Sequence, residues 1–254
     1  IVSYLTKYTS SNKHNNIPRV NSQESYEVSS FALGILSSVL ADSDSKGFNY
    51  VLTSSAHLKQ EINVENFKRA VYSTIERHES LRTVFRINKE GEIRQHILQS
   101  EDIDFTINFF DFRTLDKKEE MIKTITREDL EKPFNIGEGP LFRVHLFQLK
   151  DSEFIFHLSI HHVISDAWSI DVLFKNVLAF YSAFELGVSA ELPELNIQYK
   201  DYAAWQNEQL SKGLFKTQEA YFKETFSRCG SGTVSTRVDE SYVTKLLGYF
   251  KART

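Results

Sequence analysis

The stretch from Phe154 to Ser169 constrains the fold more than any other part of this sequence. It reads FIFHLSIHHVISDAWS, so that strand-favouring residues from Phe154 to Ile160 end in two adjacent histidines. After a short loop, apolar residues recur at helical spacing on one stripe: Ile170, Leu173, Phe174, Val177, Tyr181 and Phe184. The pattern predicts a strand, a short loop and a helix that begins at Trp168.

The adjacent histidines, His161 and His162, cannot share one face while the strand continues, because neighbouring side chains in a strand point to opposite faces. We expect one of them to project into a cleft and the other to pack inward. Taken alone, the residues also fit a structural histidine pair, with Asp166 or Ser165 as the N-cap of the helix. A zinc site is disfavoured, since the strand separates the pair and the only cysteine, Cys229, lies far away in sequence. We therefore predict no metal.

Strand and helix patterns alternate along the preceding sequence, which predicts a mixed sheet flanked by helices over about Ser29 to Leu186, an α/β (α+β) fold. The predicted elements are a strand at Tyr50–Leu58, a helix capped by Asn63, a hairpin of Leu81–Arg86 and Ile93–Leu98, a helix from a capping box of Asp116 and Glu119 through Leu130, and a strand at Leu141–Leu149 that turns into the histidine strand. The histidines thus lie on the second arm of a hairpin.

Charge and composition exclude several classes of partner. The net charge is −4 and a quarter of the residues are charged, which gives no electrostatic footprint for nucleic acid or for an anionic membrane. No apolar run reaches the roughly 18 residues that a spanning helix needs. The single cysteine excludes an internal disulfide and fits a reducing compartment, so we expect a cytoplasmic protein without nucleic-acid or membrane partners.

The string His161-His162-x-x-x-Asp166, followed by a small residue, resembles the HHxxxDG signature of nonribosomal peptide synthetase condensation domains. Chloramphenicol acetyltransferase and other CoA-dependent acyltransferases share that signature more loosely. RHESLRTVF at Arg77 to Phe85 matches the condensation-domain string RHExLRTxF at every fixed position. The resemblance implies a chloramphenicol acetyltransferase-like fold.

Three further segments extend the resemblance. PFNIGEGPLFR at Pro133 to Arg143 is similar to the family's PFxxxxGPLxR, and IQYKDYAAW at Ile197 to Trp205 resembles YxDYAxW. The family's opening motif, SxAQxRxW, is only partly kept at Ser30 to Leu36, where its glutamine and arginine are missing. The aromatic residues of the second segment also fit helix-packing anchors.

The resemblance implies the roles of the site residues. His162 would be the catalytic base, with His161 and Asp166 completing the motif, while Ala167, Trp168 and Ser169 would line the substrate tunnel. Arg82, which strand alternation alone places in solvent, would form a buried ion pair with Asp166. Ala167 replaces the family's glycine, and it would either strain a left-handed backbone or narrow the path of a substrate.

The resemblance also implies the organisation of the chain. Residues 1–16 would be a carrier-domain tail and linker, residues 17–187 the N-terminal lobe, and residues 188–254 the truncated start of a second lobe. We expect that last part to continue as a polar helix to about Phe226, followed by a strand-like TVSTRV and an amphipathic tail.

By the same resemblance, the activity would be amide-bond formation between thioesters carried on phosphopantetheine, with no cofactor bound directly. The partners would be upstream and downstream peptidyl carrier proteins and an adenylation domain. Two alternatives stay open. One is a freestanding CoA-dependent acyltransferase, and the other is a degenerate domain that serves as a docking surface or gate, which the altered opening motif and Ala167 favour.

Overall fold

The computed structural model describes residues 17–41, 50–214 and 216–228 of the 254-residue chain. The predicted carrier-domain tail and linker in residues 1–16 lie outside the described residues. The strand-like TVSTRV and the amphipathic tail predicted in residues 229–254 also lie outside them.

A four-stranded mixed sheet positions the histidines. Its order is β2-β7-β6-β5, with β5 parallel to β6 and the other pairs antiparallel, so β7 is an interior strand. Along β7, Ile160 pairs with Leu52 on one side and with Phe142 on the other. The strands are β2 (Val51–Leu58), β5 (Ile107–Asp111), β6 (Phe142–Lys150) and β7 (Glu153–His161). The predicted histidine strand and its hairpin are confirmed.

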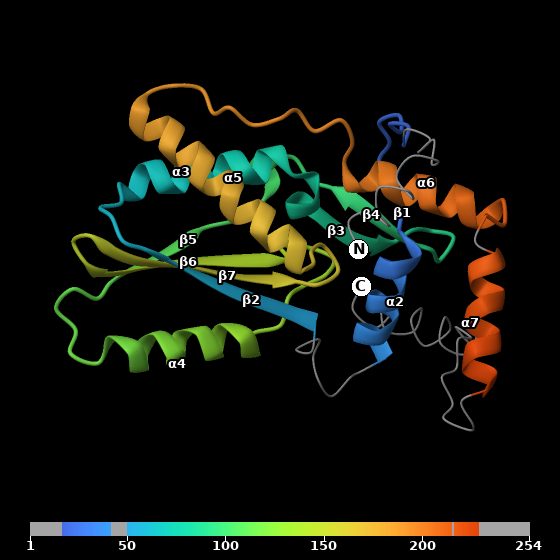
Figure 1. The fold of residues 1–254 in the computed structure, drawn as a ribbon, viewed down its shortest axis with the longest axis horizontal. Helices are drawn as coiled ribbons and strands as arrows, with labels where there is room; N and C mark the ends of the chain where they lie inside the picture. Colours follow the sequence, from blue (N-terminus) through green and yellow to red (C-terminus); the bar gives the residue numbers. More distant parts are fainter. Residues whose placement is uncertain (1–16, 42–49, 215, 229–254) are drawn as a thin grey trace, which may run out of the picture.

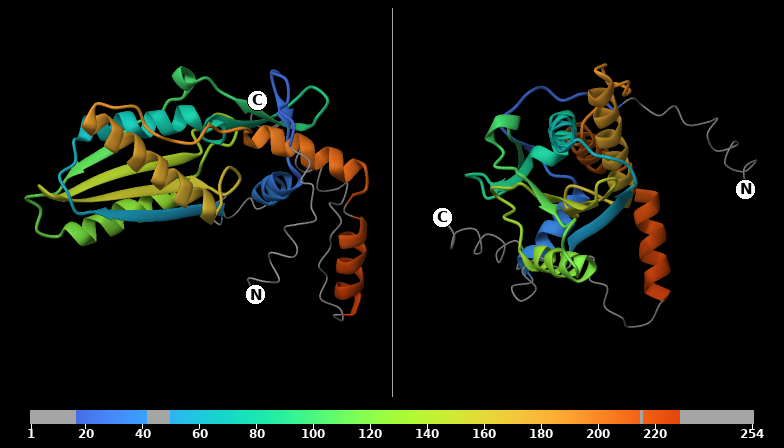
Figure 2. Two further views of the ribbon diagram at one scale, coloured as in Figure 1. Left: turned by 45° about the horizontal axis from the view of Figure 1, so that its top comes forward. Right: turned by 90° about the vertical axis from the view of Figure 1, so that its left-hand side faces the viewer.

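Helices cover both faces of this sheet, as Figures 1 and 2 show. Helices α3 (Val64–Arg77) and α5 (Ala167–Leu186) pack together on one face, and α4 (Lys118–Glu131) lies on the other. The mixed α/β architecture expected from the sequence is thereby confirmed. Asn63 caps α3 as predicted, because its side chain accepts hydrogen bonds from two backbone N–H groups of the first turn.

The predicted capping box at the start of α4 is wrong. The helix begins at Lys118 with Lys117 at the N-cap, and no side chain caps it. Asp116 therefore stands one residue before the cap, where its carboxylate cannot serve the N–H groups of the first turn in the expected register.

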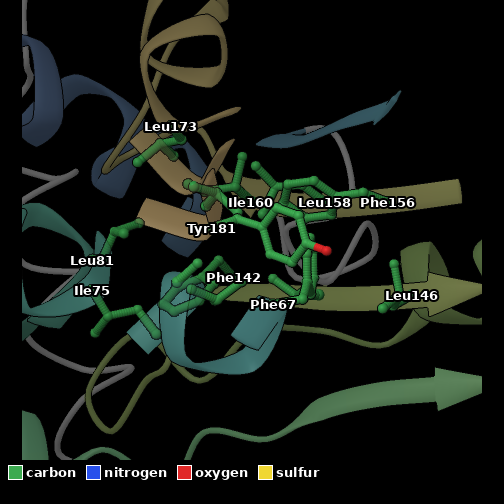
Figure 3. Packing of buried hydrophobic residues seen from close by; sticks show 14 of the residues in the cluster. Phe67, Ile75, Leu81, Phe142, Leu146, Phe156, Leu158, Ile160, Leu173 and Tyr181 are labelled. Atoms are coloured by element: carbon green, nitrogen blue, oxygen red, sulfur yellow. The ribbon is translucent and has the colours of Figure 1, made fainter. Parts of the chain in front are cut away.

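The main apolar core lies between the sheet and the α3–α5 pair (Figure 3). Alternation along β7 sends Phe156, Leu158 and Ile160 to this face, and all three are buried. The ring of Phe67 on α3 meets the ring of Phe156 edge-on at 5.1 Å between centroids. Burying one such side chain contributes about 1.5–3 kcal/mol, so this face is where most of the fold's apolar stabilisation arises.

A smaller sheet of three strands, ordered β1-β4-β3, lies beside the first. It comprises β1 (Tyr26–Glu27), β3 (Thr83–Ile87) and β4 (Ile93–Ile97), and β1 is followed closely by helix α2 (Ser30–Ala41). The hairpin of β3 and β4 was predicted, but a 3-10 turn at Glu79–Arg82 delays its first strand from Leu81 to Thr83.

A second buried cluster fills the space between α2, β3 and the end of β7. We call it the site-side cluster, and its members are Val28, Ala32, Ile35, Leu36, Phe85, Leu141 and Val163, with Phe134 among the half-buried residues packed against it. Val163 belongs to the loop that follows the two histidines. The loop is therefore anchored in a core of its own.

The C-terminal part of the described chain forms two helices where one was predicted. Helix α6 (Tyr199–Ser211) ends before Gly213, whose φ of 71° lies in the left-handed region, and α7 (Lys216–Arg228) follows. A positive φ cannot continue a right-handed helix, so the glycine separates the two. Nowhere in the described ranges is a helix both long and apolar enough to cross a membrane.

Helix α6 and the residues before it pack on the first described residues of the chain (Figure 1). The Asp201 carboxylate accepts a hydrogen bond from the Val20 N–H at 2.8 Å, and the hydroxyls of Tyr199 and Ser29 are 2.7 Å apart. The Asn207 amide donates to the Val28 carbonyl at 3.1 Å. Segments separated by about 180 positions in sequence are thus joined by side-chain hydrogen bonds.

Candidate active site

Backbone hydrogen bonds fix the end of β7 from both sides. The His161 N–H donates to the Leu141 carbonyl at 2.8 Å, and the His162 N–H donates to the Tyr50 carbonyl at 2.7 Å. The β2 side of the ladder therefore continues one residue beyond the strand. The position of His162 is set by an interior strand of the sheet, as a rigid platform requires.

His161 packs inward. Its side chain is buried, and its Nδ1 accepts a hydrogen bond from the Val163 N–H at 3.1 Å, so the neutral ring carries its proton on Nε2. The ring meets Tyr50, stacked at 6.5 Å, and Phe134, edge-on at 6.1 Å. Burial, with a smaller contribution from the neighbouring His162, lowers the pKa of His161 to about 4. Its one lone pair is already used, so His161 has a structural role.

His162 has the opposite tautomer and is half-buried. Its Nδ1 is 2.7 Å from the Ser165 carbonyl, which can only accept, so Nδ1 carries the proton and Nε2 keeps a lone pair. The ring of Phe31, from α2, meets the imidazole edge-on at 5.9 Å. His161 packs inward as one of the pair was expected to, whereas His162 is half-buried. The proton-accepting nitrogen of His162 is Nε2.

The loop that carries His162 is closed on itself. The carbonyl of His161 accepts from the Ile164 N–H and from the Ser165 hydroxyl, each at 3.1 Å. Ser165 is buried, so these bonds are shielded from water. The carbonyl that orients the His162 ring is therefore held by the strand end itself.

Asp166 is the N-cap of α5, as the residues alone allowed. Its Oδ1 accepts from the Ser169 N–H at 2.7 Å and from the Ser169 hydroxyl at 2.6 Å, and the Ser169 hydroxyl accepts from the Asp166 N–H. These bonds lower the pKa of the Asp166 carboxyl, and the nearby His162 adds to the effect. The residue is exposed and performs a capping function.

The expected ion pair between Arg82 and Asp166 is wrong. Both residues are described by the structure, and their side chains bind other partners. The Arg82 guanidinium donates to the carbonyls of Ile75 and Glu76 at 3.2 and 3.3 Å, and to the Leu98 carbonyl at 2.6 Å. The first two carbonyls belong to the last turn of α3, where backbone acceptors have no partner within the helix. Arg82 therefore joins the end of α3 to the hairpin.

The three residues expected to line a tunnel differ in their surroundings. Trp168 is 79% exposed, whereas the Ser169 hydroxyl is engaged by Asp166 in the cap. Ala167 is the first residue of α5, so its backbone is right-handed and an alanine is not strained there. Of the two effects considered for this substitution, only a narrower path for a substrate remains.

Two of the recognised motifs meet at the start of α6. Lys200 and Glu79 form an ion pair at 2.7 Å, and both side chains are mostly buried. The Gln198 side chain donates to the Arg77 carbonyl and accepts from the Glu79 N–H. RHESLRTVF and IQYKDYAAW thus form one structural unit.

Sequence reasoning missed several groups in and near the candidate site. Phe31 follows Ser30 in the altered opening motif. An aromatic residue at this position was the signal that could have indicated its contact with His162. The Ser165 carbonyl has no such signal, since every residue has one. Tyr199 was taken as a packing anchor, and it bonds to Ser29; burial raises the pKa of its hydroxyl, and the charge of Asp166 contributes. In the described residues no cluster of histidine, cysteine, aspartate or glutamate is arranged to hold a metal ion.

The family model described as "Condensation domain" matches residues 22–237. This match covers well over half of the sequence, and the chain belongs to the condensation-domain family.

Particular relatives agree with this assignment. The chain is 35% identical over 215 residues to malpibaldin synthetase of Mortierella alpina, covering 84% of this chain and 4% of that protein. It is 32% identical over 211 residues to tyrocidine synthase 3 of Brevibacillus parabrevis, covering 83% of this chain and 3% of that protein. The chain therefore spans a small part of these relatives.

Solved structures show the same fold. The first condensation domain of the calcium-dependent antibiotic synthetase, in complex with a substrate analogue, superimposes with a TM-score of 0.74 at 16% identity, over 81% of this chain and 48% of that one. The starter condensation domain of rhizomide synthetase gives a TM-score of 0.71 at 18% identity, over 80% and 48%. The chain spans about half the length of these condensation domains.

Proposed function

We propose that this chain is the N-terminal half of a condensation domain that forms amide bonds between carrier-bound thioesters in nonribosomal peptide synthesis. The observation that carries the proposal is the geometry of His162. Its Nδ1–H is bound to the Ser165 carbonyl, which leaves Nε2 as a proton acceptor on a half-buried ring at the end of an interior strand. A neutral imidazole is suited to general-base catalysis near neutral pH.

The reaction needs this acceptor at one step. The amine nitrogen of the acceptor substrate attacks the carbonyl carbon of the donor thioester, so an N–C bond forms and the C–S bond breaks. The amine proton passes to His162 Nε2 and then to the departing thiolate, which leaves as a thiol. His162 orients the amine as well as accepting its proton, and correct placement of the reacting groups is itself a large part of such rate enhancements.

The substrates would arrive on the phosphopantetheine arms of upstream and downstream peptidyl carrier proteins, with an adenylation domain supplying the activated amino acid. Membership of the condensation-domain family supports this set of partners. The rings of Trp168 and Phe31 are 79% and 56% exposed, so a second lobe could cover them.

The test is condensation between two loaded carrier proteins. We compare the 254-residue chain, the synthetase that contains it, and that synthetase with His162→Ala. The expected result is turnover by the synthetase, a loss of at least about a hundredfold with His162→Ala, and no turnover by the chain alone, because an open groove cannot exclude water or hold both arms. His57→Ala, at an exposed histidine on β2, is the matched control and should keep full activity.

Each other outcome has a defined meaning. Turnover that survives His162→Ala removes the base role. An absence of turnover by the unsubstituted synthetase contradicts the proposed function. It favours a degenerate domain that serves as a docking surface or gate. Robust transfer from an acyl-CoA by the 254-residue chain alone favours a freestanding acyltransferase.

A further inference from the structure

The segment from Pro133 to Arg143 matches a family string, yet the proposed chemistry does not use it. It connects α4 to β6, and the ring of Phe134 in it meets the His161 imidazole. We propose that Phe134, held in place by Arg143, is a positioning residue that orients His161 and, through it, the loop that presents His162. This inference rests on the proposed function and adds a residue that acts at a distance from the reacting atoms.

Phe134 supports the buried histidine from one side. Its ring is edge-on to the His161 imidazole, with centroids 6.1 Å apart and an interplanar angle of 83°. Tyr50 stacks on the same imidazole at 6.5 Å, so His161 meets two aromatic rings. Aromatic pairs at these separations favour specific orientations over free rotation. Phe134 therefore restricts the angle at which the His161 ring can lie.

Arg143 contacts the ring of Phe134 as well. The guanidinium carbon lies 3.9 Å from the centroid of the Phe134 ring, a cation–π contact. The guanidinium also donates to the carbonyls of Asp129 at 2.9 Å and Pro133 at 3.0 Å, and its Nε is 3.6 Å from the Asp129 carboxylate. The Arg143 and Asp129 side chains are only 16% and 6% exposed. The cation is thus held by two carbonyl acceptors and a neighbouring carboxylate, and it lies over the Phe134 ring.

The orientation of His161 matters because its Nδ1 makes the first bend of the site loop. That nitrogen accepts from the Val163 N–H, and Val163 itself is buried in the site-side cluster, against which Phe134 packs. A rotated His161 ring would leave this N–H without its acceptor in a buried position. His162 lies between His161 and Val163, so a shift of that bend moves the catalytic ring directly.

The experiment uses the 254-residue chain labelled with ¹⁵N-histidine and records imidazole tautomers and titrations by NMR. Phe134→Leu keeps a similar volume and removes the ring. We expect the titration midpoint of His161 to rise by about one pH unit as water gains access to its ring. We also expect each of the two histidines to show a mixture of tautomers in place of the single tautomer that it has in the unsubstituted chain. In the synthetase, the same change should lower kcat about tenfold with little change in KM, as expected for misplaced groups.

Two further substitutions separate positioning from folding. Phe134→Tyr keeps the aromatic ring and should restore both the NMR signals and kcat. Arg143→Lys keeps the charge but loses the planar face and the fork of donors, so it should behave like Phe134→Leu. If Phe134→Tyr and Phe134→Leu are equally impaired, or if Arg143→Lys matches the unsubstituted chain, the proposal is overturned.

The matched control is Phe110→Leu. Phe110 is also half-buried on the α4 side of the sheet, but its ring meets His145, at 5.9 Å, rather than His161. This change should move the signals of His145 and leave those of His161 and His162 in place. Unchanged His161 and His162 signals in Phe134→Leu would refute the positioning role. The NMR result does not require condensation, so changed signals in a chain whose synthetase is inactive would contradict the proposed function alone.

Discussion

Along β7 both faces of the four-stranded sheet are buried, but they differ in chemistry. Toward α3 and α5, strand β7 presents Phe154, Phe156, Leu158 and Ile160, while toward α4 it presents Ile155, His157, Ser159 and His161. The first face is an ordinary apolar core. The second holds a row of polar groups that ends at the candidate site, so stability and site geometry come from opposite sides of the same strand.

Some polar atoms on the α4 face of the sheet have hydrogen-bond partners and others have none. His157 is bonded by the hydroxyls of Ser55 at 2.7 Å and Ser159 at 3.3 Å. His145 Nε2 lies 3.3 Å from the Asp129 carboxylate, and within the described residues neither ring nitrogen of His145 has a hydrogen-bond partner. Buried polar atoms without hydrogen-bond partners lower the free energy of unfolding. The polar face therefore destabilises the fold relative to an apolar one.

The largest loss of unfolding free energy should follow a substitution that leaves a cavity in the apolar face. Phe156→Ala removes a buried ring that contacts Phe67 and Phe174, and we expect the free energy of unfolding to fall by about 3–5 kcal/mol. Urea denaturation measures the change. Phe109→Ala, at a ring that is 38% exposed on β5, is the control, and we expect a loss below about 1 kcal/mol. Similar losses for the two variants would show that the apolar face is not the main source of stability.

The polar face should make the fold sensitive to acid. Burial lowers the pKa of His157 from 6.5 to about 4, so between these pH values the unfolded chain binds a proton that the folded chain does not. Stability should therefore be full above about pH 6.5 and fall toward pH 4, by about 3 kcal/mol for this histidine. His157→Gln should remove that share of the loss, and His57→Gln, at an exposed position, should not. The measurement is the free energy of unfolding between pH 6.5 and pH 4. A constant value over this range would contradict the acid sensitivity that we assign to the polar face.

The smallest effect belongs to the residue once expected in a buried ion pair. Asp166→Ala should cost about 1 kcal/mol of unfolding free energy, the usual value of a lost N-cap, whereas breaking a buried pair would cost about 3–5 kcal/mol. Asn63→Ala at the start of α3 provides a matched cap. A double-mutant cycle of Arg82→Ala with Asp166→Ala should give no coupling, and a coupling of several kcal/mol would restore the ion pair.

The apolar face could be predicted from sequence because its signals are local. Alternation along Phe154 to Ile160, the helical stripe of α5 and the capping residue Asn63 each specify a geometry within one element. These signals placed β7 and α5 correctly and, with the hairpin, defined how the strand end must turn.

The polar groups could not be predicted because their partners carry no residue-type signal. Arg82 bonds to three backbone carbonyls, which any residues could have supplied, and the His162 tautomer depends on the Ser165 carbonyl. The contact between Phe31 and His162 brings together positions far apart in sequence. A motif resemblance identifies such residues, but only the packing of α2 against the loop shows what they touch.

The hydrogen bonds that join α6 to the start of the chain determine where this protein can be recombined. Val20, Ser29 and Val28 take their partners from Asp201, Tyr199 and Asn207. A chimaera that joins foreign sequence after residue 187 would separate each donor from its acceptor and leave the Lys200–Glu79 pair incomplete. Exchange of the whole block from residue 17 through α6 keeps these pairs together, so an exchange in this protein is best planned on spatial neighbours rather than on sequence position alone.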